Sequence, residues 1–301
     1  MKITAITMVK NEEDILEAFV RHTLHYVDHL LVLENGSIDT TPQILQRLHD
    51  EGLPIEIRTD RTFRYNQSEK TTQLYQQTIT KRPDFVIPLD ADEFIQAPST
   101  EIFRQQLERI PPNGVGTWPW RTYLPSNQDT ADIPTRFCFA RKHEITGHKK
   151  VLVRVPGPTD PRLVITQGNH SAKRNNRNLP AVELEHIYLA HLPIRSIQQL
   201  AQKVILGWMA NVAQYKTTNP VCGYHWGDLY RRVLSLNATD LMREAYNYSE
   251  RQSASDLDLA KSSLVIEGGC TTLHGPITAE LDRDLLLARV CSSWEAQLLQ
   301  K

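Results

Sequence analysis

Residues 85–96 read FVIPLDADEFIQ, an apolar run that passes directly into the acids Asp90, Asp92 and Glu93. The run is typical of a buried β-strand, in which side chains two residues apart point to the same side. If the strand continues to Asp92, the carboxylates of Asp90 and Asp92 face one point. Glu93 then faces away and is expected to support the structure through an arginine or a backbone amide.

Two adjacent carboxylates repel each other unless a cation lies between them, which favours a hard ion such as Mg²⁺ or Mn²⁺. Two acids at this spacing also occur by chance, at a rim or as helix caps.

The segments before this stretch alternate between short apolar runs and amphipathic runs. We predict strands over 2–9, 29–34, 55–58 and 85–90, and helices over 12–26, 41–48 and 68–79. Such alternation predicts βαβ units and a mostly parallel sheet with helices on its faces. In the second helix, Thr41 is expected as the N-cap and Pro42 as the first helical residue.

The chain changes character after about residue 110. Residues 111–127 are rich in proline, glycine and aromatic residues, and strand-like runs follow near 136–140, 151–155, 163–166 and 187–190. We interpret this part as continuation strands and long loops that cover one edge of the sheet. Helical patterns return over 196–215, 228–236 and 281–300, which indicates a helical C-terminal region.

Composition limits the classes of function. The 301 residues carry a formal net charge of −1, so no overall basicity indicates nucleic-acid binding. Ten lysines and arginines face two acids over 136–177, which is either a solvated face or a surface that meets phosphates. The four cysteines form no CxxC pair and are expected as free thiols. An acidic start and the lack of a long apolar run favour a cytoplasmic protein, with contact at the inner face of the membrane left open.

Ligands of parallel sheets bind beyond the carboxyl ends of the strands. The predicted strand ends there are all polar, over 9–12, 34–39, 60–70 and 90–93. Asn35 and Gly36 suit a tight turn, and Glu34 is placed to accept hydrogen bonds from a nucleobase or ribose. Neither GxGxxG nor GxxxxGK[ST] follows a strand, which argues against a dinucleotide fold and a P-loop.

Three stretches in this order carry a family resemblance: MVKNEEDIL (8–16), LLVLENGSIDTT (30–41) and FVIPLDADEF (85–94). They resemble successive motifs of the family 2-like glycosyltransferases with the GT-A fold, in the subgroup whose signature strand ends in DADEF. GNHS (168–171) and HLPIRSIQQLAQK (191–203) resemble that subgroup less closely. The resemblance implies a Rossmann-like α/β sheet flanked by helices. It divides the chain into a catalytic, nucleotide-sugar-binding domain over 1–195 and a helical region over 196–301 that serves as acceptor side, lid or oligomer contact.

The resemblance also implies an activity. A hexosyltransferase-like enzyme would use Mn²⁺ or Mg²⁺ to move a sugar, by inversion, from a nucleotide-diphosphate sugar to an acceptor hydroxyl. A UDP-sugar is the favoured donor, and a carbohydrate or lipid-linked acceptor in cell-surface polysaccharide or glycan synthesis is the expected partner. Relatives more often have aspartate at the position of Glu34, so the nucleobase stays open.

Site residues follow from the same carry-over. Asp92 is expected to bind the metal, and Asp90 to contact the ribose or a metal-bound water. His191 is the favoured distant metal ligand, and His170 is its alternative. The expected nucleotide-sugar site comprises Val9, Asn11, Glu34, Lys70, Asp90, Ala91, Asp92, Arg195 and Lys203.

An inverting enzyme also needs a carboxylate as general base. Glu144, Asp160, Glu183 and Glu185 lie in the appropriate half of the chain, and no spacing singles one out. Trp118, Trp120 and Tyr123 either stack on an acceptor sugar or pack in the core. Two other classes remain as alternatives: a sugar nucleotidyltransferase, which would need a basic glycine-rich loop where VKNEED stands, and a non-catalytic glycan-binding or scaffold protein.

Overall fold

The N-terminal half of the sheet is parallel and has the strand order β3–β2–β1–β4. The chain adds β2 and β3 on one side of β1 and then returns to place β4 on the other side. In the register of these pairs, Val9 lies opposite Glu34 and Met8 lies opposite Asp90. The carboxyl ends of three strands therefore meet at one switch point, where open α/β sheets bind ligands. These strands are β1 (Ile3–Val9), β2 (His29–Glu34), β3 (Ile55–Thr59) and β4 (Phe85–Asp90).

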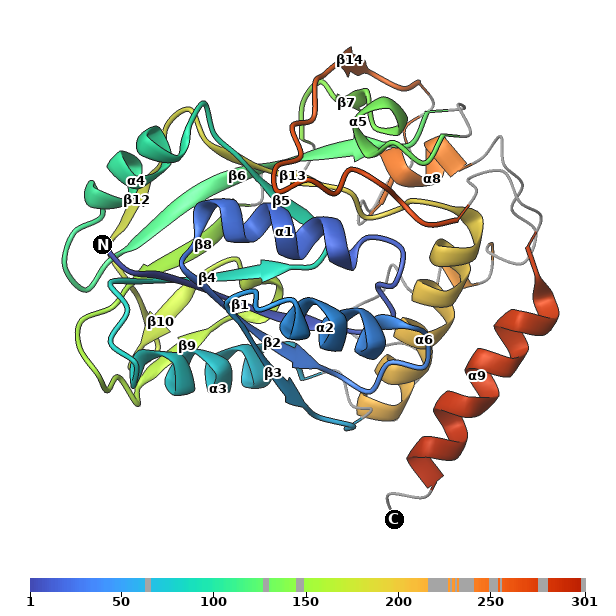
Figure 1. Cartoon of the computed structure of the whole chain (residues 1–301), viewed down its shortest axis with the longest axis horizontal. Helices are drawn as coiled ribbons and strands as arrows, with labels where there is room; N and C mark the ends of the chain where they lie inside the picture. The colour runs from blue at the N-terminus through green and yellow to red at the C-terminus, as the bar shows by residue number, and fades with distance from the viewer. Residues whose placement is uncertain are drawn as a thin grey trace.

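The structure is a computed structural model that describes residues 1–62, 66–126, 130–144, 149–215, 227, 229–230, 232, 241–248, 254, 256–275 and 281–298. Its first hundred residues follow the predicted alternation of strands and helices. The predicted α/β fold, with a parallel arrangement flanked by helices, is confirmed (Figure 1).

Each face of the parallel strands packs against its own helices because alternate side chains point to opposite faces. Ile3 and Ala5 join the core beneath one layer of helices, whereas Ile6 joins the core beneath α3 (Gln67–Ile79). Both cores are almost free of solvent exposure. The first layer consists of α1 (Leu16–Tyr26), α2 (Thr41–Asp50) and α4 (Thr100–Glu108).

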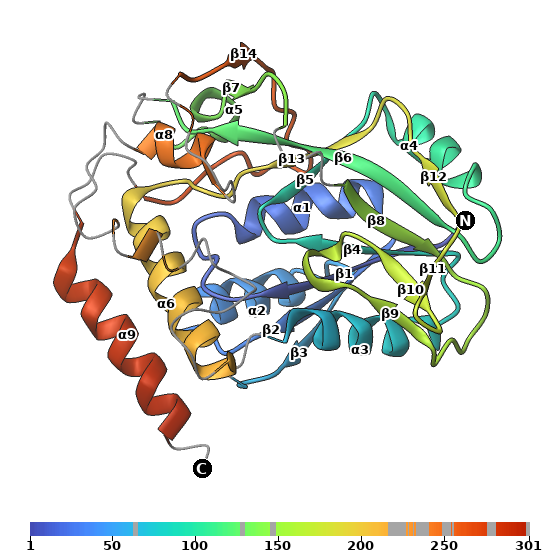
Figure 2. The ribbon, with the colours of Figure 1, turned by 180° about the vertical axis from the view of Figure 1, so that it is seen from behind.

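Later strands extend the sheet beyond β4, in the order β4–β8–β6–β7–β14, and these pairs are antiparallel. The predicted strands near 151–155, 163–166 and 187–190 are confirmed as β8, β9 and β13. A separate three-stranded sheet lies beside α3 (Figure 2). The bounds are β5 (Glu93–Gln96), β6 (Val115–Leu124), β7 (Phe139–Arg141), β8 (Lys149–Arg154), β9 (Leu163–Ile165), β10 (Ala172–Arg174), β11 (Arg177–Asn178), β12 (Ala181–Glu183), β13 (Tyr188–His191), β14 (Leu259–Lys261) and the 3₁₀ turn η1 (Gln167–Asn169).

The ten-residue strand β6 was not predicted, because its WPW segment contains Pro119, and proline lacks the amide that a central strand needs. On one side, β6 pairs with β12 over 115–117 and with β13 over 120–122. Pro119 lies where the neighbouring strand changes from β12 to β13, so none of the described strands pairs with it on that side.

Two local predictions need correction. The strand expected near 136–140 forms only from Phe139, as β7 (Phe139–Arg141), because Arg136 still belongs to a short helix, α5 (Ile133–Arg136). Asp132 starts this helix by accepting a hydrogen bond from the backbone amide of Thr135 at 3.0 Å. Helix α2 begins at Thr41 itself, so Thr40 is the N-cap. The Thr41 hydroxyl instead accepts the backbone amide of Glu12 at 2.9 Å and ties α2 to the loop after β1.

The later helices form a third hydrophobic cluster. α6 lies across the end of the sheet toward which β2 and β3 point, and α9 lies outside α6 (Figure 1). A bilayer-spanning segment is not found among the described helices, since none combines the necessary length and apolar character. The helix expected over 228–236 lies largely outside the described residues. The bounds are α6 (Ile197–Tyr215), α8 (Leu241–Tyr246) and α9 (Arg283–Leu298).

The buried side chain of His22 links the C-terminal segment at residues 265–267 to the main core. His22 in α1 contacts the carbonyl of Ile95 at 2.7 Å through Nε2, while its Nδ1 accepts the backbone amide of Glu267 at 2.9 Å. Gln96 extends the connection with two hydrogen bonds to the backbone of Val265. Burial lowers the pKa of His22 to about 4, so the neutral ring is part of the folded structure.

We expect the free energy of unfolding to fall in mild acid. His22 is protonated there in the unfolded chain but stays neutral in the folded protein. The loss begins near the unfolded pKa of about 6.5 and continues toward pH 4. Between pH 7 and pH 5 the wild-type protein should lose about 2 kcal/mol more unfolding free energy than His22→Asn. Urea unfolding at both pH values tests this, with His49→Asn on the surface as the control. Equal losses in the wild type and in His22→Asn would contradict the assignment.

Candidate active site

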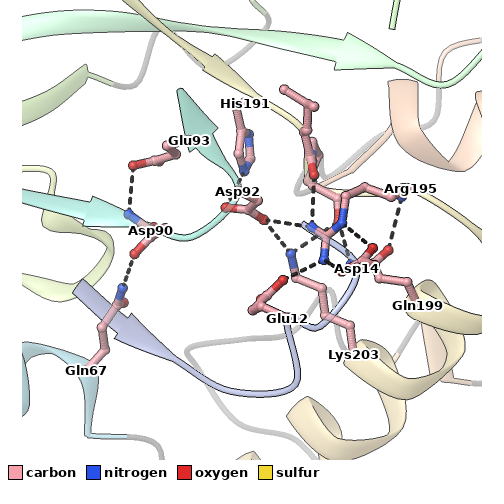
Figure 3. A network of polar contacts seen from close by, with 12 residues as sticks. Glu12, Asp14, Gln67, Asp90, Asp92, Glu93, His191, Arg195, Gln199 and Lys203 are labelled. Carbon is pink, nitrogen blue, oxygen red and sulfur yellow. Dashed lines mark hydrogen bonds and ion pairs between the residues drawn. The ribbon is translucent and has the colours of Figure 1, made fainter. Parts of the chain in front are cut away.

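The DAD segment is a turn between two strands. β4 ends at Asp90 and β5 begins at Glu93, so strand alternation does not govern Asp92 as our conditional argument assumed. Asp90 and Asp92 point to separate sets of partners (Figure 3). Both still line the same pocket.

Asp90 is held by a buried lysine and two amides. Lys150 of β8 lies 2.7 Å from Asp90 and 2.6 Å from Glu93, and it is almost fully buried. The amides of Gln67 and Asn169 donate to Asp90 at 2.9 and 3.2 Å. Glu93 also accepts the backbone amide of Asp90 at 3.1 Å, which agrees with its expected supporting role.

Asp92 meets a different set of groups because β5 pairs with β13. In that antiparallel pair His191 lies opposite Glu93, and the backbone amide of Leu192 donates to the carbonyl of Asp92 at 2.8 Å. His191 Nε2 therefore lies 3.8 Å from Asp92 Oδ1. On the other side, Lys203 Nζ of α6 lies 2.7 Å from Asp92 Oδ2. The pairing of β5 with β13 thus brings together Asp92 and His191, the two residues favoured as metal ligands.

Arg195 lies behind Asp92 and not on the pocket wall. Its guanidinium is fully buried and donates to Glu12 at 2.5 Å and to Asp14 at 2.7 and 2.9 Å. Its Nη1 lies 4.0 Å from Asp92. Arg195 therefore ties the β13–α6 connection to the loop after β1.

Burial and charge set the protonation of the site. Burial opposes the Asp92 carboxylate, but the attraction of the Lys203 ammonium and the Arg195 guanidinium prevails and lowers the pKa of Asp92 well below its usual range. Burial lowers the pKa of His191 to about 3 despite the nearby acids, so the imidazole is neutral at pH 7. Burial raises the pKa of Glu12 to about 7 against the attraction of Arg195. Asp92 is thus an anion beside a neutral histidine.

A pocket of about 240 Å³ lies between the carboxyl ends of β1, β2 and β4 and the facing side of α6. Six of the predicted site residues line it, namely Asn11, Ala91, Asp90, Asp92, His191 and Lys203. Residues not predicted also line it: Met8, Lys10, Glu12, Asn35, Gln67, Gln199, Gln202, Leu206, Gly207, Ala210 and Tyr248.

Three predicted nucleotide-binding residues lie just behind this wall and act through Asn35 and its turn. Lys70 donates to the side chain of Asn35 at 2.6 Å, and the carbonyl of Val9 accepts the backbone amide of Asn35 at 2.9 Å. Glu34 accepts the backbone amide of Ser37 at 2.5 Å. These residues position the turn after β2, where the pocket begins.

His170, the alternative metal ligand, does not line the pocket. Trp120 contacts both rings, with centroid distances of 5.4 Å to His170 and 5.1 Å to His191. His170 Nδ1 lies 3.0 Å from the carbonyl of Lys149. The geometry therefore favours His191.

None of the four carboxylates considered as general base lines the pocket. Each is bonded to another group of the described chain. Glu185 pairs with Arg109, Asp160 with Arg174, Glu183 with Lys149, and Glu144 accepts hydrogen bonds from Trp120, Thr122 and Arg141.

Among the described residues, no group of three or more His, Cys, Asp or Glu side chains is gathered closely enough to hold a metal ion. Asp92 and His191 nevertheless form a suitable pair of donors, since His191 Nδ1 is buried with no hydrogen-bond partner in the described part of the chain and Nε2 faces the Asp92 carboxylate. Ions such as Mg²⁺ are often bound by one or two protein ligands, with phosphates and water completing the shell. The residues present fit a divalent ion shared with a diphosphate.

The fold, with a pocket at the carboxyl ends of its parallel strands, is typical of α/β proteins that bind a ligand at this switch point. The sequence pattern of glycosyl transferase family 2 matches residues 4–157, more than half of the chain, and the chain belongs to this family. No curated protein matches the chain.

Similar solved structures agree only loosely with this one. A mannosyltransferase, PcManGT from Pyrobaculum calidifontis in complex with GDP-Man and Mn²⁺, is 17% identical over 40% of this chain and 36% of its own, with a TM-score of 0.32. GalNAc-T7 with UDP, GalNAc and Mn²⁺ is 8% identical over 80% of this chain and 57% of its own, with a TM-score of 0.40. A 4-diphosphocytidyl-2C-methyl-D-erythritol synthase from Anaerococcus prevotii is 16% identical over 44% and 59%, with a TM-score of 0.29. The chain thus spans between about a third and three fifths of these proteins.

Proposed function

We propose that this glycosyltransferase uses a divalent ion, Mn²⁺ or Mg²⁺, to move a sugar from a nucleotide-diphosphate donor to an acceptor hydroxyl. The observation that carries the proposal is the meeting of Asp92, His191 and Lys203 at one wall of the switch-point pocket. An anion, a neutral imidazole and an ammonium are the groups needed to hold a metal ion and a diphosphate together.

We assign a role to each wall of the pocket. Asn11 and Asn35, just after β1 and β2, would face the nucleoside, and Lys10 lines the same part of the pocket. Burial and then the charge of Lys70 lower the pKa of Lys10 to about 8, so it is a cation near neutral pH. Asp92 and His191 would hold the ion and Lys203 the diphosphate, while Asp90 faces the ribose. A UDP-sugar stays the favoured donor.

The chemistry requires a nucleoside diphosphate to leave while the anomeric carbon gains positive charge. When bound, a divalent ion supplies Lewis-acid stabilisation of the charge on the leaving phosphate. Lys203 adds a second positive charge on the same side, and its neighbour Tyr248 lies 5.3 Å from the ammonium at the ring centroid. Asp92 and His191 are buried, which strengthens these interactions because water screens them less.

The finer parts of the proposal rest on the family resemblance: transfer of a hexose, an inverting route, and a carbohydrate or lipid-linked acceptor in cell-surface glycan synthesis. The four carboxylates named above remain the proposed candidates for the general base. Each would have to leave its present partner and move into the pocket, which none of them lines. Of the alternatives, a sugar nucleotidyltransferase would need a basic, glycine-rich phosphate loop after β1. The acids Glu12 and Glu13 lie there instead, which argues against that class. A non-catalytic binding protein would share the pocket and differ in lacking turnover.

A thermal-shift screen tests the proposal. We expect one class among UDP-, GDP-, CMP- and dTDP-sugars to raise the melting temperature when Mn²⁺ is present, because ligands that bind the native state stabilise it. Without Mn²⁺ the shift should be much smaller. If no nucleotide sugar raises the melting temperature under either condition, the proposal is wrong. Donor cleavage in the presence of candidate acceptors then separates an enzyme from a binding protein.

A further inference from the structure

The Asp92 carboxylate already carries a counter-ion. Lys203 Nζ lies 2.7 Å from Asp92 Oδ2, a direct charge-assisted hydrogen bond, and the carbonyl of Pro193 accepts from the same ammonium at 3.2 Å. The positively charged lysine thus neutralises part of the charge of the carboxylate to which the proposed divalent ion would bind. The other oxygen faces His191 at 3.8 Å.

The two lysines of the acidic turn differ in their freedom to move. Lys150 is almost fully buried and bridges Asp90 and Glu93 from within the sheet. Lys203 is on α6 and lines the pocket, and its side chain is 21% exposed. It also lies over the face of the Tyr248 ring. Of these two lysines, only Lys203 can move its ammonium into the pocket without disrupting the buried core.

Repulsion between the Lys203 ammonium and a divalent ion opposes the binding of the ion to Asp92. An ion bound by Asp92 would lie within a few ångströms of Lys203, and two positive charges at such a distance repel each other in a poorly hydrated site. A diphosphate brings several negatively charged oxygens and can accept both cations. The ammonium then has a new partner in the pocket, and the carboxylate becomes available to the ion.

We propose that Lys203 is an exchangeable counter-ion that weakens the binding of a divalent ion to Asp92 until the donor diphosphate takes the ammonium. This inference rests on the proposed function, because it needs a diphosphate in the pocket. It makes ion and donor binding interdependent: each raises the affinity for the other by the same factor, as thermodynamic linkage requires. The free enzyme should bind the ion weakly.

Mn²⁺ binding to the protein alone tests the inference without any turnover. Lys203→Met removes the ammonium and keeps most of the side-chain volume. We expect it to bind Mn²⁺ at least about tenfold more tightly than the wild type, as measured by the electron paramagnetic resonance signal of free Mn²⁺, which corresponds to about 1.4 kcal/mol. Lys149→Met, which removes a surface lysine paired with Glu183, should leave the affinity unchanged. A purely structural role for Lys203 predicts weaker binding in the variant, so equal or weaker Mn²⁺ binding would overturn the inference.

A second measurement uses the wild type and so does not depend on the folding of a variant. Saturating UDP should tighten Mn²⁺ binding to the wild-type protein about tenfold or more, after correction for Mn²⁺–UDP complexes in solution. An unchanged affinity would overturn the inference even if the donor screen succeeds. If Lys203→Met tightens Mn²⁺ binding but no nucleotide sugar binds, Lys203 is still the counter-ion of Asp92 and the proposed donor is wrong.

Discussion

Replacing Asp92 with asparagine is expected to lower kcat/KM for sugar transfer by about a thousandfold and to leave the fold intact. One charge pair about 4 Å apart at an effective dielectric constant of 20 corresponds to about 4 kcal/mol, and each ~1.4 kcal/mol is a factor of ten in rate. Asparagine keeps the shape of the side chain and removes its charge. The backbone carbonyl that accepts the amide of Leu192 is untouched, so the link between β5 and β13 should persist.

The rate is measured as release of the nucleoside diphosphate from the donor found by the thermal screen. Asp50→Asn on the surface at the end of α2 is the matched control and should transfer at the wild-type rate. Circular dichroism and the melting temperature confirm folding. Turnover of Asp92→Asn near that of the wild type would remove Asp92 from the active site.

Replacing Lys150 with methionine should destabilise the protein by about 3–5 kcal/mol, the usual cost of removing one partner from a buried ion pair. Lys150 lies between Asp90 and Glu93, and burial of its ammonium is outweighed by these two acids, which raise its pKa above the usual range. Methionine would leave both carboxylates without this cation. The unfolding free energy from urea titration measures the loss.

The adjacent Lys149→Met serves as the control, because its exposed pair with Glu183 should contribute at most about 1 kcal/mol. Adding Glu93→Gln to Lys150→Met should restore part of the stability, since one of the stranded charges is then absent. Burial also raises the pKa of Glu93, so the deficit of Lys150→Met should shrink as the pH is lowered from 8 to 6 and Glu93 takes up a proton. A loss no larger than that of Lys149→Met would show that Lys150 does not hold the acidic turn together.

The parallel half of the fold follows from local sequence, because each strand and helix from Ile3 to Asp90 shows its own apolar period. The ends of those strands could be located for the same reason, which brought Asn11, Asp90 and Asp92 into view. Strand β6 could not be recognised, since Pro119 is tolerated only where β12 gives way to β13. That exchange depends on chain segments more than sixty residues away.

The polar partners of the site residues also depend on distant chain segments and not on local sequence. His191 reaches Asp92 only through the pairing of β5 with β13, and the resemblance, not the spacing, singled it out. Lys150 comes directly before the predicted strand over 151–155, and nothing in the sequence tells which acids it meets. Gln67 and Asn169 reach Asp90 from a helix and a turn about a hundred residues apart. The identity of these partners is a property of the tertiary structure.

The central claim is that a divalent ion and the donor diphosphate share the pocket at the ends of β1, β2 and β4. Crystals soaked with UDP and Mn²⁺ test this claim most directly through the anomalous scattering of manganese. We predict one strong anomalous peak within bonding distance of the Asp92 carboxylate and His191, next to the diphosphate. A peak at another place in the protein, or bound UDP with no manganese beside Asp92, would contradict it.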